Sequence, residues 1–286
     1  MRTHELRCLG PHGFHRVTYY EWGDAENPRV VVCVHGLTRN GRDFDVLARA
    51  LAPQFRVVCP DVAGRGLSQW LTHKQDYGYP VYLADMAAIV ARTGTDRVDW
   101  IGTSMGGLIG MMLAAQPETP IRRLVLNDVG PFIPRAALER LALYVGKAPP
   151  FTTFEELEHY LRMVMAPFGA LTDEQWHHLA THSSRRNDDG RLVMSYDPAI
   201  AEAFAGPLQD VALWPVWDAI RCPTLVVRGK ESDLLLSDTA DEMTRRGPKA
   251  QLVEFDGIGH APALMAEEQI AVVRQFLEQP WRESHS

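Results

Sequence analysis

The sequence predicts an α/β protein in which strands and helices alternate along the chain. Short, nearly continuous runs of valine, isoleucine and leucine recur, and such runs are typical of parallel strands that are buried on both faces. Segments with a helical period separate these runs, which indicates right-handed crossover connections. The 286 residues are enough for one large core, and 46% hydrophobic with 23% charged residues is ordinary for a globular protein.

The expected strands are short, and most are followed by an expected helix. Strands are expected at 16–22, 29–34, 55–59, 98–101, 124–126, 224–227 and 252–255. Helices are expected between or after them at 44–51, 81–92, 108–115 and 268–277.

The alternation breaks in the middle of the chain, where only helical patterns are found. These patterns lie at 136–145, 154–165 and 172–181. Because the interruption is far too long for a plain loop, we expect a helical cap of residues 132–213. The core domain is then expected to comprise residues 1–131 and 214–286.

The sequence Gly-Thr-Ser-Met-Gly-Gly at residues 102–107 follows an expected strand and precedes an expected helix. Strand, sharp turn and helix form the context of a nucleophile elbow. Ser104 occupies the turn, and glycines two residues to either side let the neighbouring strand and helix approach closely. The helix N-terminus also favours the negative charge that develops during nucleophilic attack. The motif therefore predicts that Ser104 is a nucleophile.

A general base and an orienting acid are expected further along the chain. His260 lies in a glycine-rich loop after an expected strand, from which it can reach the nucleophile and transfer its proton. Asp233 follows an earlier strand and fits the chain order of serine, acid and histidine. Asp128 and Glu231 remain alternatives, because Asp128 ends another strand and Glu231 lies two residues before Asp233.

A His-Gly turn directly before Leu37 predicts an oxyanion hole. The backbone N–H groups of Leu37 and Met105 are its expected donors, and the histidine of the turn is expected to be structural. Arg39 follows closely and is a candidate for binding a substrate carboxylate. The alternative for Arg39 is an ion pair with Asp43 or Asp45.

These motifs together resemble the α/β-hydrolase fold superfamily over nearly the whole chain. Besides the Ser104 elbow and the His260 loop, the resemblance rests on residues 35–36 and on the Asp-x-x-Gly-x-Gly-x-Ser segment at residues 61–68. It implies a mostly parallel eight-stranded sheet flanked by helices, with a helical cap inserted after the sixth strand. It also implies a structural turn, without a catalytic role, for residues 61–68.

The resemblance does not decide which carboxylate is the acid of the triad, but it reduces the number of possible reactions. In this family the acid often comes three residues after the strand-end glycine, whereas Asp233 comes four after Gly229, so Asp128 and Glu231 stay open. A serine at the elbow does not fit dehalogenases and epoxide hydrolases, which use aspartate there. The resemblance implies a serine carboxylesterase that cleaves a small to medium ester through an acyl-enzyme.

Other activities remain alternatives to the carboxylesterase. A lactonase or a carbon–carbon bond hydrolase would use the same triad, and thioesterase and amidase activities are also open. The alternative from another class is a catalytically silent homologue that binds a ligand.

Composition limits the partners of the protein. A net charge of -7 and the absence of a Lys/Arg run argue against nucleic acid, because phosphate binding requires a basic surface. No apolar segment is long enough to span a membrane, and the N-terminus lacks a signal-peptide pattern, so cytoplasmic residence is expected. His178 and His182 are four residues apart without an evident third ligand. We therefore expect neither metal nor organic cofactor, and a small-molecule ester or lactone as the partner.

Overall fold

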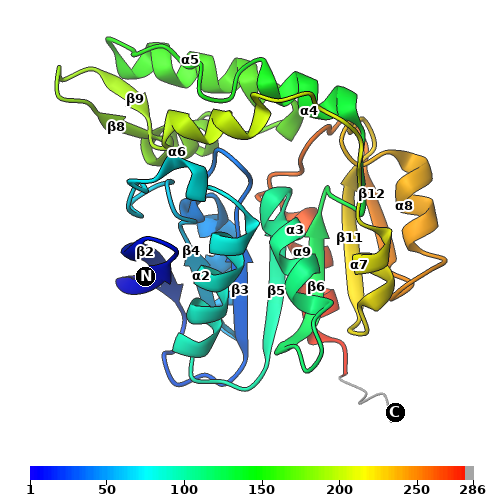
Figure 1. Cartoon of the computed structure of the whole chain (residues 1–286). Helices are drawn as coiled ribbons and strands as arrows, with labels where there is room; N and C mark the ends of the chain where they lie inside the picture. The colour runs from blue at the N-terminus through cyan, green and yellow to red at the C-terminus, as the bar shows by residue number, and fades with distance from the viewer. Residues whose placement is uncertain (281–286) are drawn as a thin grey trace.

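Eight strands form one sheet in the computed structural model, which describes residues 1–280 (Figure 1). In spatial order they are β1 (Arg2–Gly10), β2 (Gly13–Trp22), β4 (Arg56–Pro60), β3 (Val30–Val34), β5 (Val98–Thr103), β6 (Ile121–Asn127), β11 (Thr224–Gly229) and β12 (Gln251–Phe255). The β1–β2 and β2–β4 pairs are antiparallel, and the other five pairs are parallel. The expected eight-stranded, mostly parallel sheet is confirmed.

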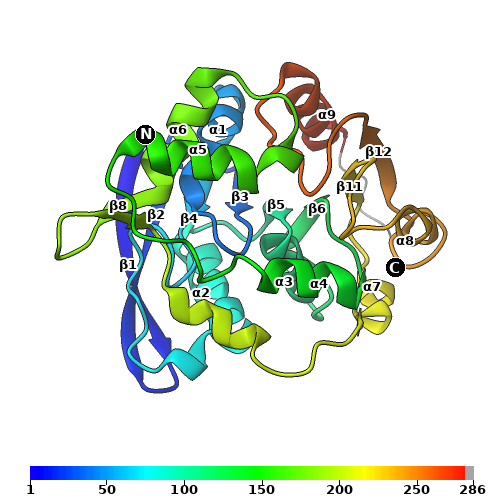
Figure 2. The same ribbon diagram turned by 90° about the horizontal axis from the view of Figure 1, so that it is seen from above.

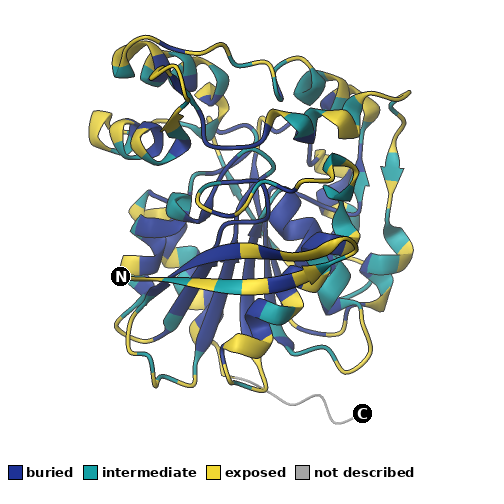
Figure 3. Ribbon diagram, turned by 60° about the vertical axis from the view of Figure 1, so that its left-hand side comes forward, coloured by how far each residue is buried: buried dark blue, intermediate teal, exposed yellow. Residues whose placement is uncertain are grey.

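The valine-rich run of β3 is buried on both faces of the sheet, as Figure 3 shows for the central strands. Val30, Val32 and Val34 pack into one apolar layer, and Val31 and Cys33 pack into the other, because successive side chains of a strand point to opposite faces. Helices α2 (Tyr79–Arg92), α3 (Met105–Ala114), α7 (Trp214–Ala219) and α8 (Ser237–Met243) cover the first face, and α1 (Asp45–Leu51) and α9 (Glu267–Glu278) cover the second.

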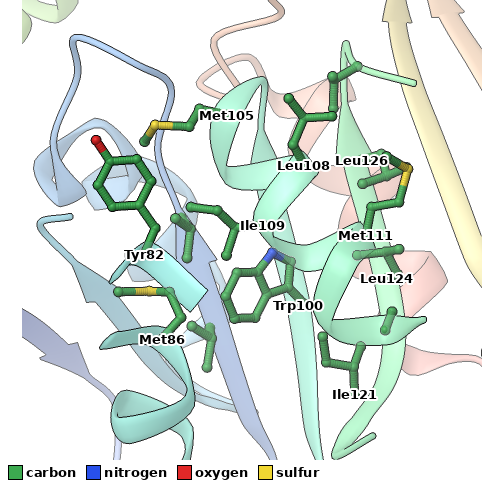
Figure 4. Close-up of a cluster of buried hydrophobic side chains, with 14 of the residues drawn as sticks. Tyr82, Met86, Trp100, Met105, Leu108, Ile109, Met111, Ile121, Leu124 and Leu126 are labelled. Carbon is green, nitrogen blue, oxygen red and sulfur yellow. The ribbon is translucent and has the colours of Figure 1, made fainter. Parts of the chain in front are cut away.

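Trp100 anchors the start of α3 on the sheet. Its indole is fully buried among apolar side chains, and its Nε1 donates a hydrogen bond to the carbonyl of Gly106 at 3.0 Å (Figure 4). A Cβ at Gly110 would lie 2.2 Å from this Nε1 atom, so the helix can approach the indole only with glycine there. The contact fixes the turn that joins β5 to α3.

The chain between β6 and α7 leaves the sheet and lies over the carboxyl ends of its parallel strands (Figures 1 and 2). Its elements are β7 (Phe132–Ile133), α4 (Arg135–Ala142), α5 (Phe154–Val164), η3 (Ala166–Phe168), α6 (Asp173–Ser183), β8 (Ser184–Arg186), β9 (Leu192–Met194), η4 (Pro198–Phe204) and β10 (Val211–Ala212). Ile133 pairs with Val211 and Phe132 with Ala212, so the segment leaves and rejoins the sheet domain at the same place.

Helices α5 and α6 begin at capping boxes. The Thr153 hydroxyl accepts from the N–H of Glu156, and the Thr172 hydroxyl accepts from the N–H of Gln175. In each case the side chain three residues on returns a hydrogen bond to the cap residue. Two otherwise unpaired N–H groups are thereby satisfied, which explains why these helices start where they do.

Several short or exposed elements were not expected from the sequence. Strand β1 is one of them, because its largely exposed residues form no apolar run. The two-residue and three-residue strands β7 to β10 and the short helices α7 and α8 carry too few residues for a period to be visible. The two remaining short 3-10 helices are η1 (Gly41–Phe44) and η2 (Lys74–Asp76). None of the helices within residues 1–280 is both long and apolar enough to cross a membrane.

Candidate active site

Ser104 lies in a strained turn between β5 and α3. Its φ is 51° and its ψ is -115°, a conformation that non-glycine residues rarely adopt. A Cβ at Gly102 would lie 2.3 Å from the carbonyl oxygen of Gly106, and one at Gly106 would lie 2.0 Å from that of Val34. Glycine is therefore required on both sides of Ser104.

Two hydrogen bonds join Ser104, His260 and Asp128. The distance from His260 Nε2 to Ser104 Oγ is 2.9 Å, and that from His260 Nδ1 to Asp128 Oδ2 is 2.7 Å. Because an ionised carboxylate only accepts, Nδ1 carries the proton and Nε2 accepts from the serine hydroxyl. The Asp128 side chain is fully buried, and that of His260 is 11% exposed. The geometry is that of a nucleophile, a base and an orienting acid.

Asp128 is held by the turn that follows the neighbouring strand β11. Its Oδ1 accepts from the N–H of Gly229 at 2.9 Å, and its Oδ2 accepts from the Ser232 hydroxyl at 2.5 Å. The backbone of Asp128 has a φ of 56°. The carboxylate is thus oriented by its own turn and by the ends of β6 and β11, which pair in parallel.

The structure contradicts the predicted contact between Asp233 and His260. Asp233 forms an ion pair with Arg140 of α4, in which Arg140 Nη2 donates to Asp233 Oδ1 at 2.9 Å. Glu231 is exposed, so the carboxylate beside His260 belongs to Asp128. The reason is topological: β6 and β11 are adjacent and parallel, so both strand ends reach the same edge of the sheet.

Two hydrogen bonds to the Gly36 carbonyl fix the orientation of the peptide between Gly36 and Leu37. The carbonyl of Gly36 accepts from His35 Nδ1 at 2.7 Å and from the N–H of Arg39 at 3.1 Å. In a trans peptide the N–H of the next residue points the opposite way, so the Leu37 N–H is directed away from these donors. The Met105 N–H is the first of helix α3 and lacks an intrahelical acceptor. Both groups suit the predicted oxyanion-hole donors.

His35 is a buried, neutral part of this turn. Its Nε2 accepts from the N–H of Val62 at 2.9 Å, so Nδ1 carries the proton that is donated to Gly36. Burial lowers the pKa of His35 to about 3. The imidazole therefore stays uncharged and orients the turn.

Arg65 contacts both residues of the predicted oxyanion hole, a position that no motif in the sequence predicts. The side chain is fully buried. Its Nε donates to the Leu37 carbonyl at 2.8 Å, and its Nη2 lies 3.5 Å from the sulfur of Met105. Its Nη1 donates to the Tyr82 hydroxyl at 2.8 Å. Within residues 1–280, no carboxylate forms a salt bridge with this guanidinium, so it places an unpaired positive charge behind the turn.

The segment at residues 61–68 is a structural turn, as expected. Asp61 accepts from the N–H groups of Gly41 and Leu67 at 2.7 and 2.8 Å, and from the Tyr20 hydroxyl at 3.0 Å. Burial raises the pKa of Asp61 to about 6. These three hydrogen bonds show that the Asp61 carboxylate fixes the surrounding backbone. None of them reaches Ser104 or His260.

Ser104 and His260 open into a cavity that is partly open to solvent. Helix α4 and the residues after it supply much of the opposite wall. The lining is mainly apolar and includes Leu37, Leu141, Tyr144, Val145, Met165 and Phe168. Arg39 and Arg140 are the two arginines of the lining. Arg140 and Tyr144 were not predicted as site residues, because only the fold brings α4 over Ser104.

Arg39 is engaged by its neighbours. Its Nε and Nη2 donate to the two carboxylate oxygens of Asp43 at 2.7 and 2.6 Å, and its Nη1 donates to the Ser183 hydroxyl at 2.8 Å. The side chain is only 5% exposed. The expected alternative, an ion pair with Asp43, is therefore what the structure contains.

The His178 and His182 pair acquires a third potential ligand from the fold. Asp45 of α1 lies beside them, with one potential ligand atom of each residue within 4.8 Å of the others. The Asp45 carboxylate accepts from Arg42 Nε at 2.8 Å, and His178 Nε2 donates to the Arg42 carbonyl at 3.0 Å. Burial lowers the pKa of His182 to about 4. Arg42 therefore already pairs with the Asp45 carboxylate that a metal ion would need as a ligand.

Known proteins resemble this chain in sequence and in structure. Residues 31–273 match the alpha/beta hydrolase family. A 3-hydroxybutyrate-oligomer hydrolase of Cupriavidus necator is 49% identical over 280 residues, which cover 95% of this chain and 96% of that protein.

Two solved structures extend the comparison to the fold. An alpha/beta hydrolase from Novosphingobium aromaticivorans is 38% identical with a TM-score of 0.84, over 96% of this chain and 98% of that one. A putative hydrolase from Rickettsia typhi is 32% identical with a TM-score of 0.92, over 98% and 100%. The sheet, the serine elbow and these relatives agree: the chain belongs to the alpha/beta hydrolase family.

Proposed function

We propose that this protein is a serine esterase that hydrolyses oligomers of 3-hydroxybutyrate. The observation that carries the proposal is the hydrogen-bonded series of Ser104, His260 and Asp128 at the floor of the cavity. The 49% identical relative is named a 3-hydroxybutyrate-oligomer hydrolase, and the units of such oligomers are joined by ester bonds. Serine chemistry and an ester substrate therefore fit the same site.

The proposed reaction begins with proton transfer from Ser104 Oγ to His260 Nε2 as the oxygen attacks the ester carbonyl. The N–H groups of Leu37 and Met105 donate to the oxyanion, and Asp128 stabilises the imidazolium. The tetrahedral species collapses, and the leaving alkoxide takes the proton from His260. A water molecule, deprotonated by His260, then cleaves the acyl-enzyme and restores Ser104.

We also propose that residues 132–213 act as a cap domain on a core of residues 1–131 and 214–286. Leu141 and Tyr144 come from this segment and line the cavity, so it would shape the substrate that reaches Ser104. For Arg39 we favour a structural role, because Asp43 and Ser183 hold its guanidinium.

The experiment is hydrolysis of the 3-hydroxybutyrate dimer and trimer, and of p-nitrophenyl butyrate, by the wild type and Ser104→Ala. Removal of the nucleophile is expected to lower kcat by about 10⁴-fold or more on every substrate. The matched control is Ser237→Ala at an exposed serine, which should keep wild-type rates. Labelling by a fluorophosphonate should be lost in Ser104→Ala alone.

The outcomes separate the proposed function from its alternatives. Ester turnover without turnover of the 3-hydroxybutyrate oligomers would overturn the substrate and leave another esterase or a lactonase. A wild type that neither reacts with the fluorophosphonate nor turns over an ester would overturn the serine-esterase proposal and favour a ligand-binding homologue.

A further inference from the structure

We propose that Arg140 forms a carboxylate-binding subsite in the active-site cavity, which recognises the anionic end of a hydroxy-acid oligomer. The inference rests on the proposed ester hydrolysis and adds the part of the substrate that the cavity selects. The 49% identical relative says nothing in its name about which end of an oligomer is bound.

The acidic or basic side chains that line the cavity, within the part of the chain that the structure describes, are cationic or titratable ones, although the protein as a whole is acidic. The chain has a net charge of -7, yet the lining has two arginines, and no aspartate or glutamate is found among the described residues that form it. The rest of the wall is mainly apolar. A cation in such surroundings attracts an anionic group more strongly than one on an open surface, because low-dielectric walls focus its field.

Of the two arginines, Arg140 is the one available to a substrate. The Arg39 side chain is 5% exposed and bonded through Nε, Nη1 and Nη2, whereas the Arg140 side chain is 33% exposed. Asp233, the partner of Arg140, is 49% exposed. Water therefore reaches the Arg140–Asp233 pair, and its contribution to stability is small.

The Arg140 guanidinium keeps donors for a second anion. Asp233 accepts from Nε and Nη2, which form one edge of the planar group, and Nη1 lies outside this pair. Arginine carries five N–H donors in a fork that matches a carboxylate. Asp233 thus holds the guanidinium in place. Tyr144, two residues after the end of α4, also lines the cavity, so its phenol can contribute to the same subsite.

The subsite has a consequence for where the oligomer is cut. Ser104 attacks the carbonyl of the ester and becomes acylated by one part of the chain. The unit beyond the ester oxygen leaves as an alcohol, protonated by His260, and carries the terminal carboxylate held by Arg140. Water then releases the acyl part as a second hydroxy acid. Because Arg140 and Ser104 share one cavity, cleavage is expected near the carboxyl end.

The test compares the 3-hydroxybutyrate dimer as the free acid with its carboxamide, which has the same shape and no charge. We expect the wild type to prefer the acid by about 10-fold to 100-fold in kcat/KM, the range for hydrogen bonds to a charged group. Arg140→Gln should raise KM for the acid and remove this preference, while kcat/KM for the carboxamide and for p-nitrophenyl butyrate stays within about threefold. Arg140→Lys should restore part of the preference, since it keeps the charge without the fork.

Arg135→Gln is the matched control. Arg135 lies on the same helix and its side chain is 61% exposed, with an ion pair to Glu139, and it is outside the cavity lining. It should keep the wild-type preference for the acid. Equal losses of the acid and the carboxamide in Arg140→Gln, or equal turnover of both by the wild type, would overturn the subsite alone. Turnover of neither dimer by a wild type that cleaves p-nitrophenyl butyrate would instead overturn the proposed substrate.

Discussion

At the scale of single residues, both the backbone conformation and the carboxylate of Asp128 position this acid beside His260. The backbone of Asp128 has a φ of 56°, Gly229 donates to its Oδ1, and Ser232 donates to Oδ2, the oxygen that also accepts from His260. Asp233 lies in the loop after β11 and forms an ion pair with Arg140 instead. The orienting acid is therefore chosen by turn conformation and by the available partners, since both carboxylates follow strands of the same sheet.

This arrangement predicts different effects for two conservative substitutions. Asp128→Asn is expected to lower kcat for p-nitrophenyl butyrate by about 10⁴-fold, because the amide cannot hold His260 in the tautomer that accepts the serine proton. Asp233→Asn should keep kcat within about tenfold. Steady-state kinetics on both variants measures kcat, and circular dichroism checks that both are folded. A larger loss in Asp233→Asn than in Asp128→Asn would contradict the geometry described above.

At the scale of elements, Ser104 and the oxyanion-hole candidates lie where the turns after β3, β4 and β5 meet. The turn after β4 brings Arg65 beneath the other two, where it binds the Leu37 carbonyl and the Met105 sulfur. A buried guanidinium without a carboxylate is costly, so its position beside both oxyanion-hole candidates indicates a role in holding them and in stabilising developing negative charge.

Arg65→Met tests this role. We expect kcat to fall by about 10²-fold on charged and neutral esters alike, the effect of losing one oxyanion-hole donor, with KM within about threefold. Arg65→Lys should recover part of kcat, because an ammonium keeps the charge but cannot bridge both turns. A loss confined to KM, or a loss matched by unfolding in circular dichroism, would show that Arg65 has only a packing role.

At the scale of the whole molecule, buried titratable groups make stability depend on pH. The pKa values of His35 and His182 are lowered from 6.5 to about 3 and about 4 by burial, and that of Asp61 is raised from 3.8 to about 6. Between pH 6 and pH 4 the unfolded chain therefore holds protons on both histidines that the folded chain lacks, whereas the folded chain holds one on Asp61 that the unfolded chain largely lacks. The histidines thus stabilise the fold above pH 6.5 and lose this effect on acidification, while Asp61 partly offsets the loss.

The free energy of unfolding should consequently fall as the pH decreases from 6 to 4, by about 1.4 kcal/mol per pH unit for one excess proton. Urea unfolding at pH 7, 6, 5 and 4 measures this dependence. His182→Gln should nearly abolish this dependence, because the proton on His35 in the unfolded chain is then balanced by the proton on Asp61 in the folded chain. A wild-type free energy that is constant or rises toward pH 4 would contradict the assignment of these groups as buried.

The sequence by itself determined the features that depend on neighbouring residues. Valine runs such as residues 30–34 specify buried strands through side-chain alternation, and the glycines at 102 and 106 specify the turn that presents Ser104. The loop of His260 follows from the same local reasoning. The α/β class, the parallel sheet, the nucleophile elbow and the alpha/beta hydrolase family could be predicted on that basis.

Only the tertiary structure decided which distant groups meet. Asp128 and Asp233 both follow strands, and the choice between them required the positions of Ser232, Arg140 and the backbone of Asp128. Arg65 reaches the Leu37 and Met105 turns, and Arg140 reaches the cavity, only because the fold packs the turn after β4 and helix α4 there. No local period in the sequence predicts these positions. The physical reason is that a hydrogen bond between residues far apart in the chain depends on the packing of whole elements, whereas strand burial and turn conformation depend on adjacent side chains.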